Sequence, residues 1–137
     1  IRCHEPRMDL IRKNTKERDG NVFEGEVVEV FLDTNFDRKT YFHFAVNPEG
    51  TLYDALRFDK HALNSNAKVA VVKKNKGWMV ELAIPWKDLN VKPDAKIRMG
   101  LLLSRDRKGD TRQFLQYPPL GEWNHTPHNF GILTFAE

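Results

Sequence analysis

The stretch from Glu26 to Gly50, EVVEVFLDTNFDRKTYFHFAVNPEG, decides the fold of this chain. It holds two runs with period-two alternation, 27–33 and 41–47, joined by a polar loop, and this pattern is typical of a β-hairpin. Successive side chains of a strand point to opposite faces. One face of the hairpin is therefore apolar, and we predict that it is buried: Val28, Val30, Leu32, Phe42, Phe44 and Val46.

The other face of the hairpin is polar and aromatic. It carries Glu29, Tyr41, His43 and Asn47, which places a carboxylate, an imidazole and an amide on one surface. A strand face that only meets water is usually rich in Lys, Thr and Ser. We therefore expect this second face to line a functional surface.

The rest of the chain continues as short strands separated by turns. After the hairpin we expect a single helical turn at 86–89, a charged turn at 106–110 and strands at 51–56, 68–73, 78–84, 97–104, 112–116 and 131–136. No long segment has the 3.6-residue period of a helix. The prediction is one all-β domain over residues 1–137, an antiparallel β-sandwich or jelly roll of seven to eight strands.

Composition narrows the function classes. The 137 residues are 40% hydrophobic and 30% charged, as in an ordinary globular domain. The net charge is only +3 and acidic residues are interspersed among the basic ones, so we expect no nucleic-acid partner. The longest apolar run, Met99 to Leu103, predicts no membrane insertion. Cys3 is the only cysteine, which excludes an intrachain disulfide.

No catalytic motif is present. The sequence has no G-x-S-x-G, no H-E-x-x-H and no glycine-rich phosphate loop, so we predict that the domain is not an enzyme. His125 and His128 are poorly spaced for a metal because Pro127 lies between them. A sugar site needs a flat aromatic platform and convergent polar groups, and Trp123, in a loop rich in Pro and Gly, is the candidate platform.

A family resemblance rests on an ordered set of motifs. The chain resembles the family 9 carbohydrate-binding modules and their relatives in the DOMON-like β-sandwich group through VVEVFLD (27–33), FAVNPEG (44–50), YDA (53–55), GWMVELAIPWKDL (77–89) and HTPHNFGILTF (125–135). The resemblance implies non-catalytic binding of an oligo- or polysaccharide by ring stacking and hydrogen bonds. It also implies an extracytoplasmic location and tethering to other domains of a larger protein. Family members carry additional strands before the position of Ile1, so the chain is expected to be an N-terminally incomplete copy or an excised part.

The resemblance also implies a set of site residues. The two sandwiching tryptophans of the family fall on Phe23 and Trp123, its glutamate on Glu29 and its asparagine on Asn47, while its strand arginine is replaced by Ala45. His43 lies two residues before that position, and a basic residue of the hairpin loop has two candidates here, Arg38 and Lys39. The implied sugar-binding set is Phe23, Glu29, Arg38, Lys39, His43, Asn47 and Trp123.

Each of these residues also has a structural interpretation. Phe23 can be a core residue, Trp123 a loop anchor, Glu29 an ion-pair partner on a solvated face, and Asn47 a turn former before Pro48. Trp78, in contrast, alternates with apolar residues, which predicts burial.

The cofactor requirement and two alternative functions complete the expectations. No cofactor is required, although the resemblance implies structural calcium, for which Glu5 and Glu26 are the nearest acidic groups. One alternative is a DOMON-like haem or redox module that uses a histidine with Met8, Met79 or Met99. The other is a ligand-free accessory domain, which would present an apolar patch on the second hairpin face.

Overall fold

The computed structural model describes residues 1–137 except 13, 93, 95–96, 122 and 136–137. In these described residues the secondary structure consists of short 3₁₀ turns and strands, without an α-helix. The elements are β1 (Arg2–His4), η1 (Met8–Leu10), η2 (Val22–Glu24), β2 (Val27–Asp33), β3 (Phe42–Val46), β4 (Leu52–Leu56), β5 (Lys68–Lys74), β6 (Gly77–Ala83), η3 (Trp86–Leu89), β7 (Arg98–Lys108), β8 (Arg112–Tyr117), η4 (Pro127–Asn129) and β9 (Gly131–Thr134).

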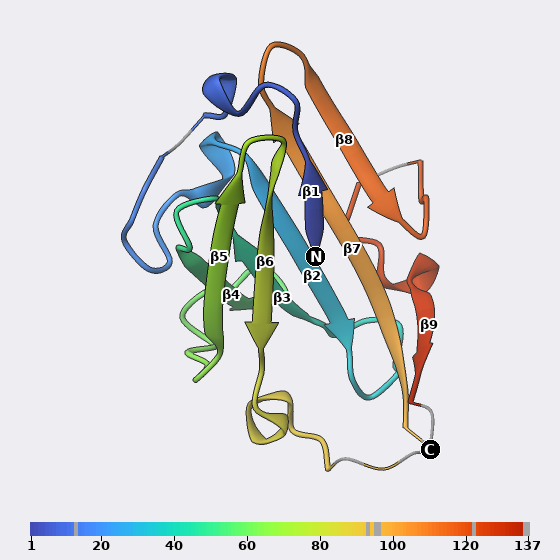
Figure 1. Cartoon of the computed structure of the whole chain (residues 1–137). Coiled ribbons are helices and arrows are strands. Elements are labelled where there is room, and N and C mark those ends of the chain that lie inside the picture. Colours follow the sequence, from blue (N-terminus) through green and yellow to red (C-terminus); the bar gives the residue numbers. More distant parts are fainter. Residues whose placement is uncertain (13, 93, 95–96, 122, 136–137) are drawn as a thin grey trace.

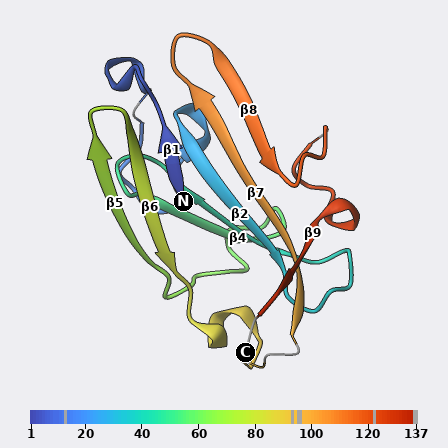
Figure 2. The same ribbon diagram turned by 45° about the vertical axis from the view of Figure 1, so that its right-hand side comes forward.

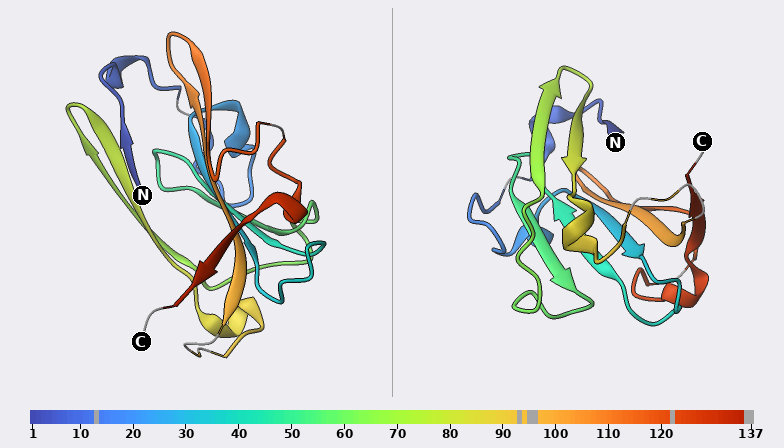
Figure 3. Two further views of the ribbon diagram at one scale, coloured as in Figure 1. Left: turned by 90° about the vertical axis from the view of Figure 1, so that its right-hand side faces the viewer. Right: turned by 90° about the horizontal axis from the view of Figure 1, so that it is seen from below.

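The strands form two antiparallel sheets that lie face to face (Figures 1 and 2). The smaller sheet has the order β1-β6-β5, and the larger has the order β4-β3-β2-β7-β8, with β9 also paired to β7. Seen from below, the β5–β6 hairpin stands on one side of the larger sheet (Figure 3, right). The predicted antiparallel β-sandwich is confirmed.

The apolar face of the β2–β3 hairpin forms the centre of the core, as predicted. The two strands pair with Val30 opposite Phe44 and Leu32 opposite Phe42. Five of the six predicted residues are buried and Val30 is half-buried, and all six pack in one cluster with Trp78 and Val80 of β6. Burying a Val, Leu or Phe side chain contributes about 1.5–3 kcal/mol, so this layer holds the two sheets together.

Gly77 allows β1 to pass closely over the start of β6. Its φ is +148°, and a Cβ at this position would lie 2.1 Å from the carbonyl oxygen of Cys3. No side chain fits in that space. Gly77 therefore allows the close approach of β1 to β6.

The predicted charged turn at 106–110 is wrong. Strand β7 continues to Lys108, and Arg105, Asp106 and Arg107 pair with β8 as regular strand residues. The stretch was expected to leave the sheet because it is charged. It stays in the sheet because Arg105, Asp106 and Arg107 meet Glu26, Arg112 and Glu5, each of opposite charge and each from another segment.

The other element predictions agree with the structure within a few residues. Residues 75–76 join β5 and β6, and residues 86–89 form the single turn η3. Among the described residues, no helix is long and apolar enough to cross a membrane.

Candidate functional site

The floor of the candidate site is a buried carboxylate–imidazole pair on the second hairpin face. Nε2 of His43 on β3 lies 2.8 Å from Oε2 of Glu29 on β2. Both residues are buried. Oε1 of Glu29 accepts hydrogen bonds from Ser104 and from Asn124, each at 2.9 Å. Three side chains from three other segments therefore fix the orientation of this carboxylate.

A second imidazole, that of His125, lies next to this buried pair, with its ring centroid 5.3 Å from that of His43. Nδ1 of His125 lies 2.6 Å from the hydroxyl of Tyr41. The ring of Phe31 stacks on His43 at 4.1 Å and meets His125 edge-on at 5.2 Å. The segment between β8 and η4 thus returns over the second face and packs its aromatic groups against it.

Burial changes the titration of these groups. Burial, assisted by the neighbouring His43, lowers the pKa of His125 to about 4. Burial raises the pKa of Tyr41 to about 12, against the opposing effect of the nearby Arg57 guanidinium. At neutral pH the contact between His125 and Tyr41 is consequently one between two uncharged groups.

Two exposed aromatic rings stand at the rim. Trp123 is 67% exposed and Phe58, which follows β4, is 58% exposed. Their ring centroids are 5.9 Å apart, and Phe58 also stacks on His125 at 4.3 Å. Phe23 stands at the same pocket, half-buried, with its ring 5.7 Å from His43 and 5.0 Å from Tyr53.

These groups line a pocket of about 490 Å³ on the outer face of the larger sheet. This volume is within the range of small-molecule sites. The lining residues are Phe23, Glu29, His43, Tyr53, Arg57, Phe58, Asp106, Lys108, Arg112, Phe114, Trp123, Asn124 and His125. The pocket therefore combines aromatic walls with a hydrogen-bonded polar floor.

A larger hollow, of about 700 Å³, lies between β1 and the inner side of β7 and β8. Its charged lining residues are Arg2, Arg105, Arg107 and Asp110. Arg105 and Arg107 are bound to buried glutamates and Asp110 to Arg107, and its described lining residues include no exposed aromatic pair like Trp123 and Phe58. We therefore place the candidate site in the smaller pocket.

The structure brings four of the seven predicted site residues together. Phe23, Glu29, His43 and Trp123 all line the pocket, although the sequence separates them by up to 100 positions (123 minus 23). Trp123 is exposed and is not the buried loop anchor of the alternative interpretation.

Asn47 does not line this pocket. Its Oδ1 accepts hydrogen bonds from the backbone N–H groups of Glu49 and Thr51, each at 3.0 Å. Its Nδ2 donates to Asn14 and to the carbonyl of Thr15. The amide is fully used in holding the turn after β3, as the structural interpretation predicted.

Arg38 and Lys39 also lie outside the pocket. Asp37 accepts bonds from the backbone N–H groups of Lys39 and Thr40 at 2.7 Å, which fixes the β2–β3 loop. Nη1 of Arg38 donates to the carbonyl of His128 at 2.8 Å. These contacts direct the loop towards η4, so its basic residues do not reach the pocket.

Several pocket residues were not predicted. Arg57 and Phe58 follow β4, and Arg112 and Phe114 come from β8. Phe58 carried the same signal that singled out Trp123, an aromatic residue in a polar loop. The β8 pair carried no such signal, because only sheet pairing with β7 brings that strand beside the hairpin.

A family-level comparison agrees with this geometry. Residues 8–136 match the model of the family described as carbohydrate family 9 binding domain-like. The chain belongs to this family. None of the curated proteins compared with the chain matches it.

Two solved structures resemble this family 9 domain. One is a carbohydrate binding module family 9 from Caldicellulosiruptor kristjanssonii in complex with cellotriose, with 18% identity and a TM-score of 0.66 over 98% of this chain and 66% of that chain. The other is a candidate carbohydrate-binding protein from Bacteroides uniformis, with 19% identity and a TM-score of 0.68 over 92% of this chain and 68% of that chain. The chain thus spans about two thirds of the length of each, and the likeness shows a shared fold.

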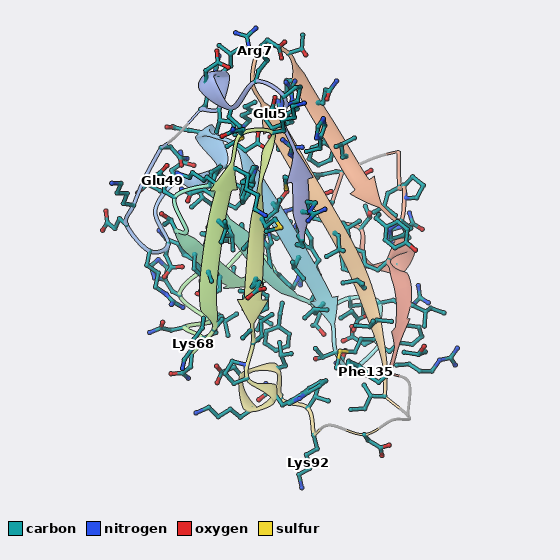
Figure 4. All side chains as sticks on the ribbon, in the orientation of Figure 1. Glu5, Arg7, Glu49, Lys68, Lys92 and Phe135 are labelled. Carbon is teal, nitrogen blue, oxygen red and sulfur yellow. The ribbon has the colours of Figure 1, made fainter. Side chains whose placement is uncertain are left out.

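The calcium expectation is not supported by the side chains of this family 9 domain. Oε1 of Glu26 binds Arg105 at 2.6 Å, and both oxygens of Glu5 bind Arg107, at 2.5 and 2.9 Å. Glu5 lies at the upper end of the sandwich (Figure 4). Guanidinium groups occupy the position a cation would need, and the described residues contain no group of three or more acidic, His or Cys side chains placed for a metal. Glu5 and Glu26 therefore do not offer free carboxylates for a calcium ion.

The methionines of the haem alternative do not contribute to the site. Met8, Met79 and Met99 lie on η1, β6 and β7, and none of them lines the pocket. The ligand-free alternative predicted an apolar patch on the second hairpin face. That face instead ends in a pocket with a hydrogen-bonded carboxylate at its floor.

Proposed function

We propose that this family 9 domain binds carbohydrate in the pocket formed by the second hairpin face. One observation carries the proposal: exposed Trp123 and Phe58 stand above the buried Glu29–His43 pair. Pyranose rings have apolar faces and hydroxyl edges. A flat aromatic surface beside oriented polar groups therefore matches their chemistry.

In the proposed mode a sugar ring stacks on Trp123 or Phe58 and directs its hydroxyls to the floor. The carboxylate of Glu29 accepts a hydrogen bond from a sugar hydroxyl. Ser104 and Asn124 hold this carboxylate in place before the ligand binds. Such preorganisation reduces the entropy cost of binding. Of the predicted set, the proposed site keeps Phe23, Glu29, His43 and Trp123, and it adds Phe58, His125, Asn124 and Tyr53.

The domain is proposed to act as a binding module. Its pocket holds two carboxylates, but Glu29 is bound by three side chains and Asp106 by two cations. Both carboxylates are thus engaged by neighbouring side chains, which supports a role in holding a ligand. We infer a non-catalytic role in a larger extracytoplasmic protein whose other domains process or display glycans.

The test is calorimetric titration of the domain with cellotriose and with a panel of neutral oligosaccharides. For the best ligand, Trp123→Ala should weaken binding about tenfold, because an aromatic platform contributes about 1–1.5 kcal/mol. Tyr117→Ala is the matched control, since Tyr117 is also an exposed aromatic residue but does not line the pocket.

Unchanged affinity in Trp123→Ala would remove this pocket as the sugar site. Equal losses in the two variants would point to an unspecific effect of losing surface aromatic groups. Absence of binding to every sugar in the panel would overturn the proposed function.

A further inference from the structure

The pocket carries an excess of positive charge. Three cationic side chains line it, Arg57, Lys108 and Arg112, against two carboxylates, Glu29 and Asp106. A neutral sugar can accept hydrogen bonds from one such cation, but it carries no charge to balance the excess. The cations in the pocket therefore call for a separate explanation.

Lys108 and Arg112 share one acidic partner. The two oxygens of Asp106 accept bonds from Nε and Nη2 of Arg112 at 3.0 and 2.9 Å, and Nζ of Lys108 lies 3.2 Å from the same carboxylate. Nζ of Lys108 also donates to the carbonyl of Phe23. One carboxylate thus neutralises only one of the two cations. The side chain of Arg112 is 70% exposed, so its outer N–H groups face the solvent at the pocket.

Arg57 differs from the other two pocket cations in its partners. Among the residues that the structure describes, no carboxylate forms an ion pair with its guanidinium, although the side chain lines the pocket beside Phe58. Glu29, the other pocket carboxylate, is bound by His43, Ser104 and Asn124. The Arg57 guanidinium is hydrogen-bonded to the neutral hydroxyl of Tyr41, so its charge is not compensated by either pocket carboxylate, and its other N–H groups can meet an anionic ligand.

The backbone holds Arg57 in an unusual position. Its φ is +57°, in the left-handed region that residues with long side chains rarely adopt. The backbone N–H of Arg57 donates to the carbonyl of Tyr41 at 2.9 Å, which fixes this conformation at the end of β4. Backbone conformations of this kind concentrate at functional sites. In this domain the conformation places the Arg57 guanidinium, which no pocket carboxylate neutralises, in the same pocket as the exposed ring of Phe58.

We propose that the pocket selects acidic sugars, with the carboxylate of a uronic acid residue bound by Arg57 and assisted by Arg112. This proposal rests on the proposed function and names its ligand class. A guanidinium binds a carboxylate through two parallel N–H···O bonds, a geometry that a neutral CH₂OH group cannot reproduce. The apolar face of the same sugar ring remains available to Phe58 or Trp123.

The experiment compares matched ligands that differ only at C6. The methyl glycosides of glucose, galactose and mannose are titrated into the domain beside those of their uronic acids, at low and at high salt. At least one uronate should bind about tenfold more tightly than its neutral partner at low salt. The difference should shrink at high salt, because exposed charges are screened.

Arg57→Gln should weaken binding of the uronate about tenfold more than binding of its neutral partner, and so remove the preference for the uronate. Lys68→Gln is the control for net charge, because Lys68 is exposed on β5 in the other sheet, away from the pocket (Figure 4). This variant should retain the full preference. Circular dichroism and thermal melting of both variants show whether either change affects folding.

The outcomes separate the two proposals. Binding of neutral sugars with equal or weaker binding of every uronate overturns the selection of acidic sugars and leaves the proposed function standing. Loss of the preference in Lys68→Gln as well assigns it to net charge and overturns the role of Arg57. If neither neutral nor acidic sugars bind, both proposals fail.

Discussion

Whether a polar residue of this domain supports the fold or lines the pocket cannot be told from its residue type alone. Glu29 and Asn47 lie on the same hairpin and both are buried. Glu29 presents a carboxylate at the floor of the pocket, whereas the amide of Asn47 bonds the backbone of its own turn. The difference is one of position, since Asn47 follows the last residue of β3 and Glu29 lies within β2.

Asn47→Ala should therefore lower stability without affecting sugar binding. The substitution leaves the backbone N–H groups of Glu49 and Thr51 without their acceptor, which costs about 1–3 kcal/mol for buried polar groups. Urea unfolding measures the loss. Asn47→Asp is a useful comparison, because it retains the acceptor and loses only the two bonds that Nδ2 donates. Weaker sugar binding by a fully stable Asn47→Ala protein would return Asn47 to the site.

At the scale of elements, β7 is the strand on which the molecule depends most. It pairs with β2, β8 and β9, and its outer half carries alternating charges inside the sheet. Arg105 binds Glu26 and Arg107 binds Glu5, so the first segment of the chain is joined to the central sheet by buried ion pairs. These pairs explain why a charged stretch remains a strand.

Arg105→Met should destabilise the domain by about 3–5 kcal/mol, because the buried carboxylate of Glu26 loses its cation. Urea unfolding of the single and double variants provides the measurement. Arg105→Met combined with Glu26→Gln should recover much of the loss, since no uncompensated charge remains.

The wild-type melting temperature should also be the same with calcium and with EDTA. A calcium-dependent rise in that temperature would show that arginines do not replace the metal here.

At the scale of the whole molecule, buried titratable groups link folding to pH. Hydrogen bonding to Arg107 lowers the pKa of Glu5 below its ordinary value of 4.5, and burial lowers that of His125 from 6.5 to about 4. Glu5 stabilises the fold above its ordinary pKa, and this contribution is lost as the pH falls through the lowered value. Between pH 6.5 and about 4 the unfolded chain protonates His125 while the folded protein does not, which favours unfolding.

Stability should therefore fall steadily as the pH is lowered from 7 to 4, with no matching fall from 7 to 8. Urea unfolding at several pH values gives the free energy of unfolding directly. His125→Gln should flatten the part of the curve between pH 6.5 and 4, because the variant has no imidazole to titrate there. A stability maximum near pH 5 would contradict the assignment.

Much of the fold could be predicted from the sequence because its decisive pattern is local. The alternation of Val28, Val30 and Leu32 with Glu29 and Phe31 sets the two faces of β2, whatever the strand pairs with. The same pattern placed Trp78 in the core. The end of β7 was predicted incorrectly because its charges are compensated by Glu5 and Glu26, about 100 and 80 positions away.

The sequence by itself determined the sandwich, its apolar layer and the hairpin face on which the pocket lies. Only the tertiary structure decided which polar groups meet there. Asn124 reaches Glu29 across 95 positions, His125 reaches Tyr41 across 84, and the cations of β8 arrive through pairing with β7. The physical reason is that side-chain alternation depends on neighbouring residues alone, whereas a pocket depends on how distant segments pack against one another.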